Sequence, residues 1–160
     1  MSQKNRTVVT TEPGKQEVIV NRMFDAPRDL VFQVMNDPNA LHKWWGPRSH
    51  EIKVVQYDPK PGGSWRIIHT DPSGQKHGFH GVVHDIVAPE RIVRTFEYEG
   101  MPGHVLMETT TLEDVDGRTK FTLQLVFQSV ADRDGMVQSG MESGMAEGHD
   151  RLEELLASYK

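Results

Sequence analysis

The chain has 160 residues, a size that suits one domain, and its lack of cysteine excludes disulfides, thiol nucleophiles and thiolate zinc sites. Its 18 lysines and arginines against 23 acidic residues give a formal net charge of −5 without a basic cluster, which disfavours nucleic-acid binding. No apolar run approaches the ~20 residues of a membrane span, and the polar N-terminus is not a signal peptide. We therefore expect a cytoplasmic protein.

The first part of the chain predicts one strand and two short helices. Residues 16–24 include the β-rich run EVIVNRMF, which predicts a strand. A helix is expected from Pro27, where the missing N–H of proline costs little. The breaker 36–38 (Asn-Asp-Pro) ends that helix and begins a second one, which leads to the adjacent pair Trp44 and Trp45.

Six further strands and a long helix are expected after the tryptophan pair. The strands are predicted at residues 50–58, 64–70, 78–87, 91–99, 104–114 and 118–128. In the last of them, Phe121, Leu123 and Leu125 alternate with polar residues, as is typical of a half-buried antiparallel strand. Residues 131–159 are predicted to be helical. This order indicates an α+β fold in which the terminal helix covers one antiparallel sheet.

Three glycines recur every fourth residue in the predicted terminal helix. Gly140, Gly144 and Gly148 would each cost roughly 0.8–1.0 kcal/mol against alanine in a helix interior, so something must offset them. One interpretation is close packing of the helix on its neighbours. The other is a hollow beside the helix, lined by Met141 and Met145, which would imply a ligand. Both can hold at different heights along the helix.

Histidine and glutamate side chains raise the question of a metal site. His80 and His84 lie four apart on a predicted strand, so they share a face unless a bulge intervenes. With His69 and Glu108 they could form a metal or acid–base site. The alternative is that His80 and His84 face solvent. We favour the absence of a metal, because the chain carries no recognisable metal or nucleophile motif.

Glu108 has two open orientations. It shares strand parity with Leu106 and Thr110, and an inward orientation would bury its carboxylate beside any cavity. A buried carboxylate needs a partner, for which the candidates are Arg66, Arg94 or a histidine. A twist or bulge just before Glu108 would instead turn the side chain outward.

A set of segments spread over almost the whole chain carries a family resemblance. They are RMFDAPRDLVFQVMNDPNALHKWWGP, PGGSWRI, the Pro-Glu-Arg of APERIV, METTTLEDVDGRTKFTLQLVFQS and ESGMAEGHDRLEELL. With them the chain resembles the SRPBCC, or START-like, superfamily, which includes the birch-pollen allergens. Within it, the chain is similar to bacterial single-domain proteins related to the C-terminal domain of the activator of the ninety-kilodalton heat-shock protein ATPase.

The resemblance implies a helix-grip fold. In this fold a curved antiparallel sheet wraps a long C-terminal helix, two short helices after the first strand close one side, and an elongated apolar cavity often lies between helix and sheet. We expect residues 1–14 to be flexible and residues 15–160 to form the single domain. Superfamily members bind lipids, sterols, polyketides or plant hormones, and some are cyclases, so the fold alone does not choose the function.

Our first hypothesis is the binding of a small apolar or amphipathic molecule in such a cavity, without a cofactor. An alternative is a cyclase-like enzyme that uses Glu108 with a histidine such as His69. A chaperone-activator module is a third, and a chaperone partner is disfavoured because the first strand begins almost at once, without the additional N-terminal domain of eukaryotic activators. At most a weak homodimer is expected. The candidate lining residues are Trp44, Trp45, Trp65, Ile67, His69, Phe79, Val83, Phe96, Thr110, Met141, Gly144 and Met145.

Overall fold

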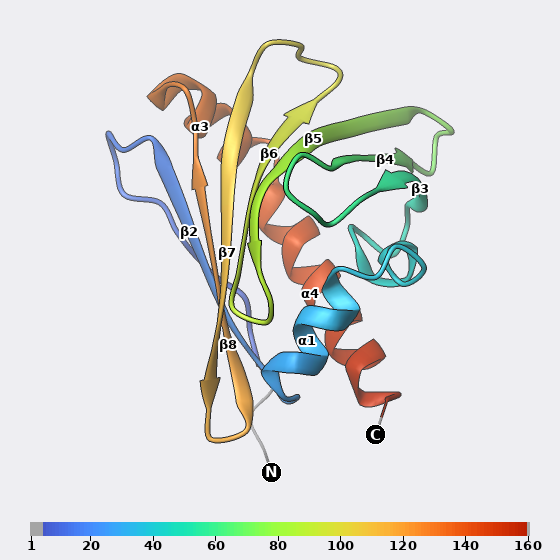
Figure 1. The fold of residues 1–160 in the computed structure, drawn as a ribbon. Helices are drawn as coiled ribbons and strands as arrows, with labels where there is room; N and C mark the ends of the chain where they lie inside the picture. Colours follow the sequence, from blue (N-terminus) through green and yellow to red (C-terminus); the bar gives the residue numbers. More distant parts are fainter. Residues whose placement is uncertain (1–4, 160) are drawn as a thin grey trace.

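A computed structural model describes residues 5–159, which form one curved, unclosed antiparallel sheet of eight strands and four helices (Figure 1). The strands are β1 (Val8–Thr10), β2 (Glu17–Phe24), β3 (Glu51–Tyr57), β4 (Ser64–Thr70), β5 (Lys76–Val87), β6 (Arg91–Tyr98), β7 (Val105–Val115) and β8 (Arg118–Val126). Their order across the sheet is β1-β2-β8-β7-β6-β5-β4-β3. The helices are α1 (Arg28–Met35), α2 (Leu41–Trp44), α3 (Val130–Gln138) and α4 (Met141–Ala157).

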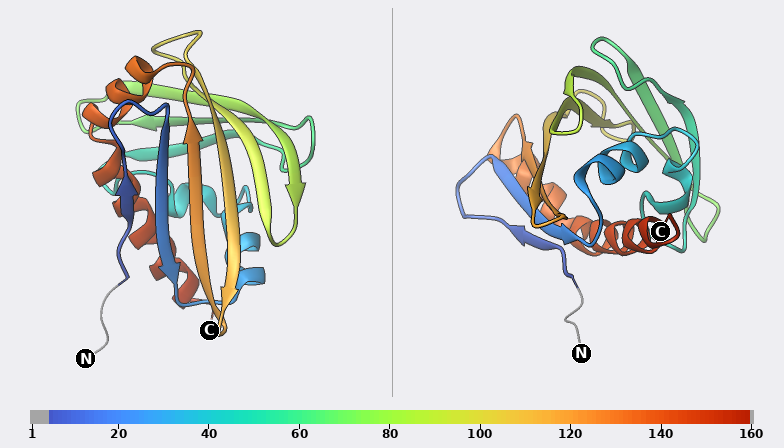
Figure 2. Two further views of the ribbon diagram at one scale, coloured as in Figure 1. Left: turned by 90° about the vertical axis from the view of Figure 1, so that its left-hand side faces the viewer. Right: turned by 60° about the horizontal axis from the view of Figure 1, so that its bottom comes forward.

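The sheet curls around α4, and α1 and α2 close one side, so the predicted helix-grip fold is confirmed (Figure 2). The inner face of β8 carries Phe121, Leu123 and Leu125, which are buried in the alternation that the sequence predicts. Leu152 and Leu156 anchor the C-terminal half of α4 in the core, where they are almost completely buried. Burial of these apolar groups, rather than helix propensity, stabilises a helix that is rich in glycine.

The hairpin between β7 and β8 shows how local sequence fixes the register. Val115 pairs with Arg118 across a two-residue turn, in which Asp116 and Gly117 both have positive φ angles, 54° and 82°. Asp-Gly is the preferred sequence for such a turn, because its twist matches that of the strands. The turn aligns Glu108 with Leu125, and β6 in turn aligns Arg94 with Glu108.

The segment expected to be flexible, residues 1–14, is partly ordered. Val8–Thr10 forms β1, with Val9 opposite Val20 of β2, while residues 1–4 lie outside the described residues. The prediction missed this strand because three residues are too few for a periodicity signal. Two valines and a threonine nevertheless suit the otherwise unpaired edge of β2.

The single terminal helix predicted over residues 131–159 is wrong, since the structure has two helices there. Gly140 adopts a left-handed conformation with a φ of 87° and forms the N-terminal cap of α4 after the last residues of α3. Glycine takes this conformation without the steric penalty of a Cβ atom. Gly140 therefore redirects the chain, and only Gly144 and Gly148 lie inside α4.

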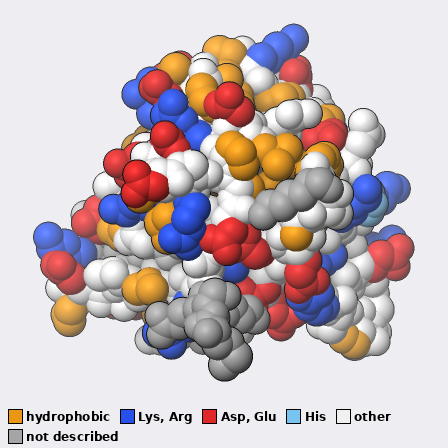
Figure 3. Space-filling model, turned by 90° about the horizontal axis from the view of Figure 1, so that it is seen from below, with side chains coloured by type: hydrophobic (Ala, Val, Ile, Leu, Met, Phe, Trp, Pro, Cys, Tyr) orange, Lys and Arg blue, Asp and Glu red, His pale blue; other side chains and the backbone are white. Residues whose placement is uncertain are grey.

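None of the helices in residues 5–159 has the length and apolar character required to span a membrane. On the face seen from below, Lys and Arg side chains lie interspersed with Asp and Glu side chains (Figure 3).

Candidate ligand-binding cavity

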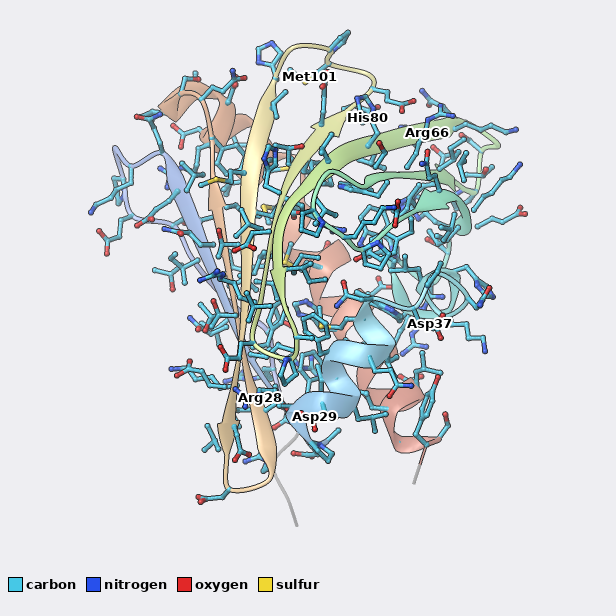
Figure 4. The ribbon with its side chains drawn as sticks, viewed as in Figure 1. Arg28, Asp29, Asp37, Arg66, His80 and Met101 are labelled. Atoms are coloured by element: carbon cyan, nitrogen blue, oxygen red, sulfur yellow. The ribbon has the colours of Figure 1, made fainter. Side chains whose placement is uncertain are left out.

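A cavity of about 680 Å³ lies between the inner face of the sheet and helices α2, α3 and α4. Met101 lies on the loop between β6 and β7 (Figure 4) and is exposed. With exposed His104 and Ser139, it forms part of the lining, so these residues mark the mouth of the cavity. The lining is mainly aromatic, aliphatic and methionine side chains. They include Trp44, Trp45, Phe79, Phe96, Leu106, Phe121, Leu123, Leu125, Phe127, Met136, Met141 and Met145.

The glycines of α4 have different surroundings at different heights. A Cβ atom built on Gly148 would lie 3.2 Å from the carbonyl oxygen of Trp44 and 3.3 Å from the amide nitrogen of Gly46. On Gly144, a Cβ atom would meet only the Pro47 ring, at 3.7 Å. Gly148 thus permits the close approach of α4 to the end of α2, whereas Gly144 leaves space open to the cavity.

An arginine of α4 holds the turn that carries the tryptophan pair. The Arg151 Nη1 donates to the carbonyl oxygens of Trp45, Gly46 and Pro47 at 3.4, 3.0 and 3.3 Å. Gly46 has a φ of 79°, and a Cβ atom there would lie 2.6 Å from the His69 ring. The turn therefore requires glycine, and it fixes both tryptophans against α4.

The two tryptophans have different positions in the cavity wall. Trp44 is 6% exposed and belongs to the hydrophobic core, while Trp45 is partly buried. The Trp45 ring packs edge-on against three rings of the sheet, with centroid distances of 4.7 Å to His69, 5.7 Å to Phe79 and 6.4 Å to Trp65. The pair thus joins the short helix to an aromatic cluster on β4 and β5.

A buried ion pair lies in the wall formed by β6 and β7. The Arg94 Nε donates to Glu108 Oε1 at 2.8 Å, and the Arg94 guanidinium lies 4.4 Å from the centroid of the Trp65 ring. Burial opposes the positive charge, but Glu108 and Tyr57 together outweigh it, so the pKa of Arg94 is raised. The inward orientation of Glu108 is therefore the one observed, and its partner is Arg94.

Tyr57 lies beside this pair. Its hydroxyl donates to the Asn36 side-chain oxygen at 2.5 Å, and burial raises its pKa although the Arg94 charge acts in the opposite direction. The phenol is therefore neutral at neutral pH, and it lies outside the cavity lining.

Two buried histidines of the lining are neutral. Burial lowers the pKa of His69 to about 4 and that of His149 to about 3. The His149 Nδ1 lies 2.7 Å from the Thr7 hydroxyl, whereas the His69 Nε2 has no hydrogen-bond partner among residues 5–159. The Trp44 Nε1 is also buried without a partner in this part of the chain.

Two histidines at the rim, His77 and His104, make three polar contacts. His77 Nε2 lies 3.0 Å from Asp71 Oδ2, and its Nδ1 lies 3.0 Å from the Tyr98 hydroxyl. Across the mouth, His104 Nδ1 lies 2.9 Å from Asp132 Oδ1, which links the β6–β7 loop to α3. Charged groups at the rim are therefore paired.

The other histidines of β5 point away from the cavity. His80 Nδ1 lies 2.9 Å from Glu99 Oε2 on the outer face of the sheet, where Arg66 also binds Glu99 (Figure 4). His84 is exposed. In residues 5–159 no three His, Asp or Glu side chains are grouped so that they could hold a metal ion.

A family comparison accounts for most of the chain. The family model described as Activator of Hsp90 ATPase homolog 1-like protein matches residues 25–157. The chain belongs to this family. Its matched region begins just before α1 and includes the tryptophan pair, the Arg94–Glu108 pair and all of α4. No protein with a curated description matches the chain.

Solved structures from bacteria share the fold. Protein Ms6760 from Mycobacterium smegmatis superposes with a TM-score of 0.86 at 24% identity, covering 94% of this chain and 96% of its own. A protein from Rhodobacter sphaeroides gives a TM-score of 0.87 at 24% identity, covering 96% of this chain and 99% of its own. At these sequence identities the structural likeness establishes that this chain has the helix-grip fold. It does not identify a ligand.

The structure brings most of the predicted site residues together in the cavity lining. These are Trp44, Trp45, His69, Phe79, Phe96, Thr110, Met141, Gly144 and Met145. The prediction was wrong for three residues, Trp65, Ile67 and Val83. They lie in the core with at most 1% exposure and form no part of the lining. The Arg94 guanidinium and the Phe96 ring pack on Trp65, which separates this tryptophan from the cavity.

Several lining residues were missed by the sequence interpretation. The alternating face of β8 could have supplied Phe121, Leu123 and Leu125, which were predicted to be buried but not assigned to a site. Met136 could not have been found, because its position depends on the break between α3 and α4.

Proposed function

We propose that this protein binds a small apolar or amphipathic molecule in the cavity between α4 and the sheet. The observation that supports this proposal is the cavity of about 680 Å³, a volume within the ~300–1,000 Å³ range of small-molecule sites. Its lining joins many apolar side chains to a few polar ones, which is the usual composition of such sites.

The stability cost of the cavity is a second argument. Protein interiors are close-packed, and each void removes contacts that would stabilise the fold. Gly144 adds to this cost, since a glycine inside a helix loses roughly 0.8–1.0 kcal/mol against alanine where there is room for a methyl group. A bound molecule would restore the missing contacts.

The test is to fill the space from α4. We expect Gly144→Leu to place an isobutyl group in the cavity and to weaken binding of an apolar fluorescent probe such as anilinonaphthalene sulfonate, because it removes part of the space. Ser143→Leu is the matched control, because Ser143 is the exposed neighbour outside the lining and should leave binding unchanged. Equal probe binding by both variants, with cooperative unfolding retained, would contradict the proposal.

Native mass spectrometry addresses the natural ligand. Protein purified under non-denaturing conditions should carry an additional mass that organic extraction releases, and the Gly144→Leu variant should retain less of it. The cyclase-like alternative has less support, because Glu108 pairs with Arg94 instead of a histidine. A cytoplasmic location, at most a weak homodimer and the lack of a cofactor or chaperone partner stay predictions from the sequence.

A further inference from the structure

The carboxylate of Glu108 has one oxygen atom that the ion pair with Arg94 does not use. Arg94 Nε donates to Oε1, and Oε2 has no hydrogen-bond partner among residues 5–159. Oε2 is nevertheless not one of the fully buried side-chain atoms that lack a partner in this part of the chain. The Glu108 side chain keeps 10% of its surface exposed, so a second molecule can reach the unused oxygen.

The exposed part of Glu108 faces the cavity. Its strand, β7, lies between β6 and β8, so neighbouring strands cover both of its edges. Alternate residues of a strand point to the same face, and Glu108 shares its face with Leu106 and Thr110, which also line the cavity. Met107, on the opposite face, is exposed to solvent on the outside of the sheet. The accessible surface of Glu108 therefore belongs to the cavity wall.

The ion pair has a fixed position well inside the cavity. The Arg94 guanidinium is held between the Glu108 carboxylate and the Trp65 ring, and separating the pair would leave two buried charges without partners. Glu108 lies four residues along the chain from His104 at the mouth, which corresponds to about 13 Å at ~3.3 Å per strand residue. Glu108 Oε2 is thus a fixed polar point in a mainly apolar lining.

The chemistry of this oxygen restricts the ligand. A carboxylate can only accept hydrogen bonds, so the ligand group that matches it is a donor. The Arg94–Glu108 pair already balances its own charges, and an ionised ligand group beside it would be buried without a counter-ion. A hydroxyl group donates a hydrogen bond and carries no charge, so it meets both conditions.

We propose, on the basis of the ligand-binding function above, that the cavity selects an uncharged amphipathic molecule whose hydroxyl group donates a hydrogen bond to Glu108 Oε2. The hydroxyl end enters first, and the apolar body lies along Met141, Gly144 and Met145 toward the mouth. Long-chain alcohols have this chemistry. The probe for the experiments is decanol, whose extended length is comparable to the depth of Glu108.

The first experiment compares decanol with methyl nonyl ether by calorimetric titration at neutral pH. The two molecules have the same formula and both contain an acceptor oxygen, but only decanol has a donor. Decanol should bind roughly ten-fold more tightly, because hydrogen bonds to charged groups are among the stronger ones in proteins. Equal affinities, or tighter binding of the ether, would overturn the proposal.

Charged probes of the same chain length test the selection for an uncharged group. Decanoate and decylammonium should both bind more weakly than decanol, because each places a third charge beside a balanced pair. Tighter binding of decylammonium would instead mean that Glu108 acts as the counter-ion of a cationic ligand. Tighter binding of decanoate would mean that the acidic head stays in water and that the tail enters first. Either result would overturn the proposal.

The second experiment observes the carboxylate directly in the unaltered protein. The Glu108 carboxyl carbon is assigned in ¹³C-labelled protein through its connectivity to the backbone. Decanol should shift this signal, and methyl nonyl ether should shift it much less, because only the alcohol donates to the carboxylate. Equal shifts with both probes would contradict a hydrogen bond to Oε2. The result does not depend on the folding of a variant.

Two double variants form the matched pair. Arg94→Met with Glu108→Met replaces the buried pair by apolar side chains, a change that is often neutral or stabilising for such pairs. The affinity of decanol should then lie within about two-fold of that of the ether, since the roughly ten-fold advantage of the charged hydrogen bond is lost. Arg66→Met with Glu99→Met removes an ion pair on the outer face of the sheet, outside the lining, and should leave the preference for decanol unchanged. A preference for decanol that survives in the first double variant would overturn the assignment to Glu108.

The outcomes separate the two proposals. Equal binding of decanol and the ether, with equal shifts of the Glu108 signal, overturns the hydroxyl-selective site and leaves an apolar ligand site standing. Absence of binding for every probe overturns both.

Discussion

We expect substitution by alanine to change the stability of the protein in opposite ways at the two glycines inside α4, Gly144 and Gly148. Gly144→Ala adds a methyl group whose nearest neighbour is the Pro47 ring at 3.7 Å, an ordinary contact distance. The helix then gains ~0.8–1.0 kcal/mol of propensity without strain. For a chain of this size, that gain corresponds to a rise of about 2–4 °C in Tm.

Gly148→Ala places the same methyl group 3.2 Å from the Trp44 carbonyl oxygen and 3.3 Å from the Gly46 nitrogen. Both are backbone atoms of a turn that Arg151 holds through hydrogen bonds to its carbonyls, so they cannot rotate away as a side chain would. Overpacking typically costs ~1–3 kcal/mol, which exceeds or cancels the propensity gain. We expect Gly148→Ala to be about 1–3 kcal/mol less stable than Gly144→Ala.

The assay is urea unfolding of both variants and the unaltered protein, followed by circular dichroism and fitted to a two-state transition. Unfolding free energies of the two variants that agree within about 0.3 kcal/mol would refute the reasoning, because the two positions would then have equivalent surroundings. A Gly144→Ala variant that is less stable than the unaltered protein would also refute the reasoning, because it would mean that the space beside Gly144 is occupied.

Three further predictions concern a turn, an ion pair and pH. Gly140→Ala should lower the unfolding free energy by ~1–2 kcal/mol, because alanine disfavours the φ of 87° at this position. If urea unfolding showed no change in stability, the break between α3 and α4 would be contradicted. Glu108→Gln should cost ~3–5 kcal/mol, since it leaves Arg94 buried without its carboxylate, and adding Arg94→Met should restore part of that loss in the same assay. His69 and His149 are neutral in the folded state, with pKa values lowered from 6.5 to about 4 and about 3, so their contribution to stability is complete above pH 6.5 and lost as the pH falls toward those values. Unfolding free energies measured between pH 7 and pH 4 should therefore decline, and the decline should be shallower for His149→Gln; an unchanged slope would argue against a buried neutral His149.

The sheet could be predicted because its signals are local. The alternation in β8 and the Asp116-Gly117 turn identify a hairpin without any tertiary knowledge. In β5, by contrast, the register shifts between Val83 and Asp85, so apolar residues occur on both parities and the inward face cannot be read from the sequence.

The polar part of the site depends on pairing between strands. Arg94 and Glu108 are direct cross-strand partners, which requires the register of β6 against β7. That register follows from the length and shape of a loop, 99–104, in which Pro102-Gly103 marks a turn but does not fix the pairing of the strands that follow. The sequence could therefore name Arg94 only as one of several candidate partners.

Gly140 was misassigned for a different reason. A glycine at helical spacing fits a helix interior and a left-handed cap equally well, and the choice depends on where α3 and α4 pack. The regular four-residue spacing with Gly144 and Gly148 favoured the helix interior, although the three glycines have separate roles.

The uneven support of α4 has a consequence for its dynamics. Leu152 and Leu156 fix its C-terminal half in the core, whereas residues 141–146 border the cavity and have fewer atoms to pack against. Amide hydrogen exchange should therefore be fast in the first turns and slow in the last ones, within one continuous helix. A ligand in the cavity would slow amide exchange in the first turns of α4 alone. Ligand binding would then order one end of the helix without changing the shape of the protein.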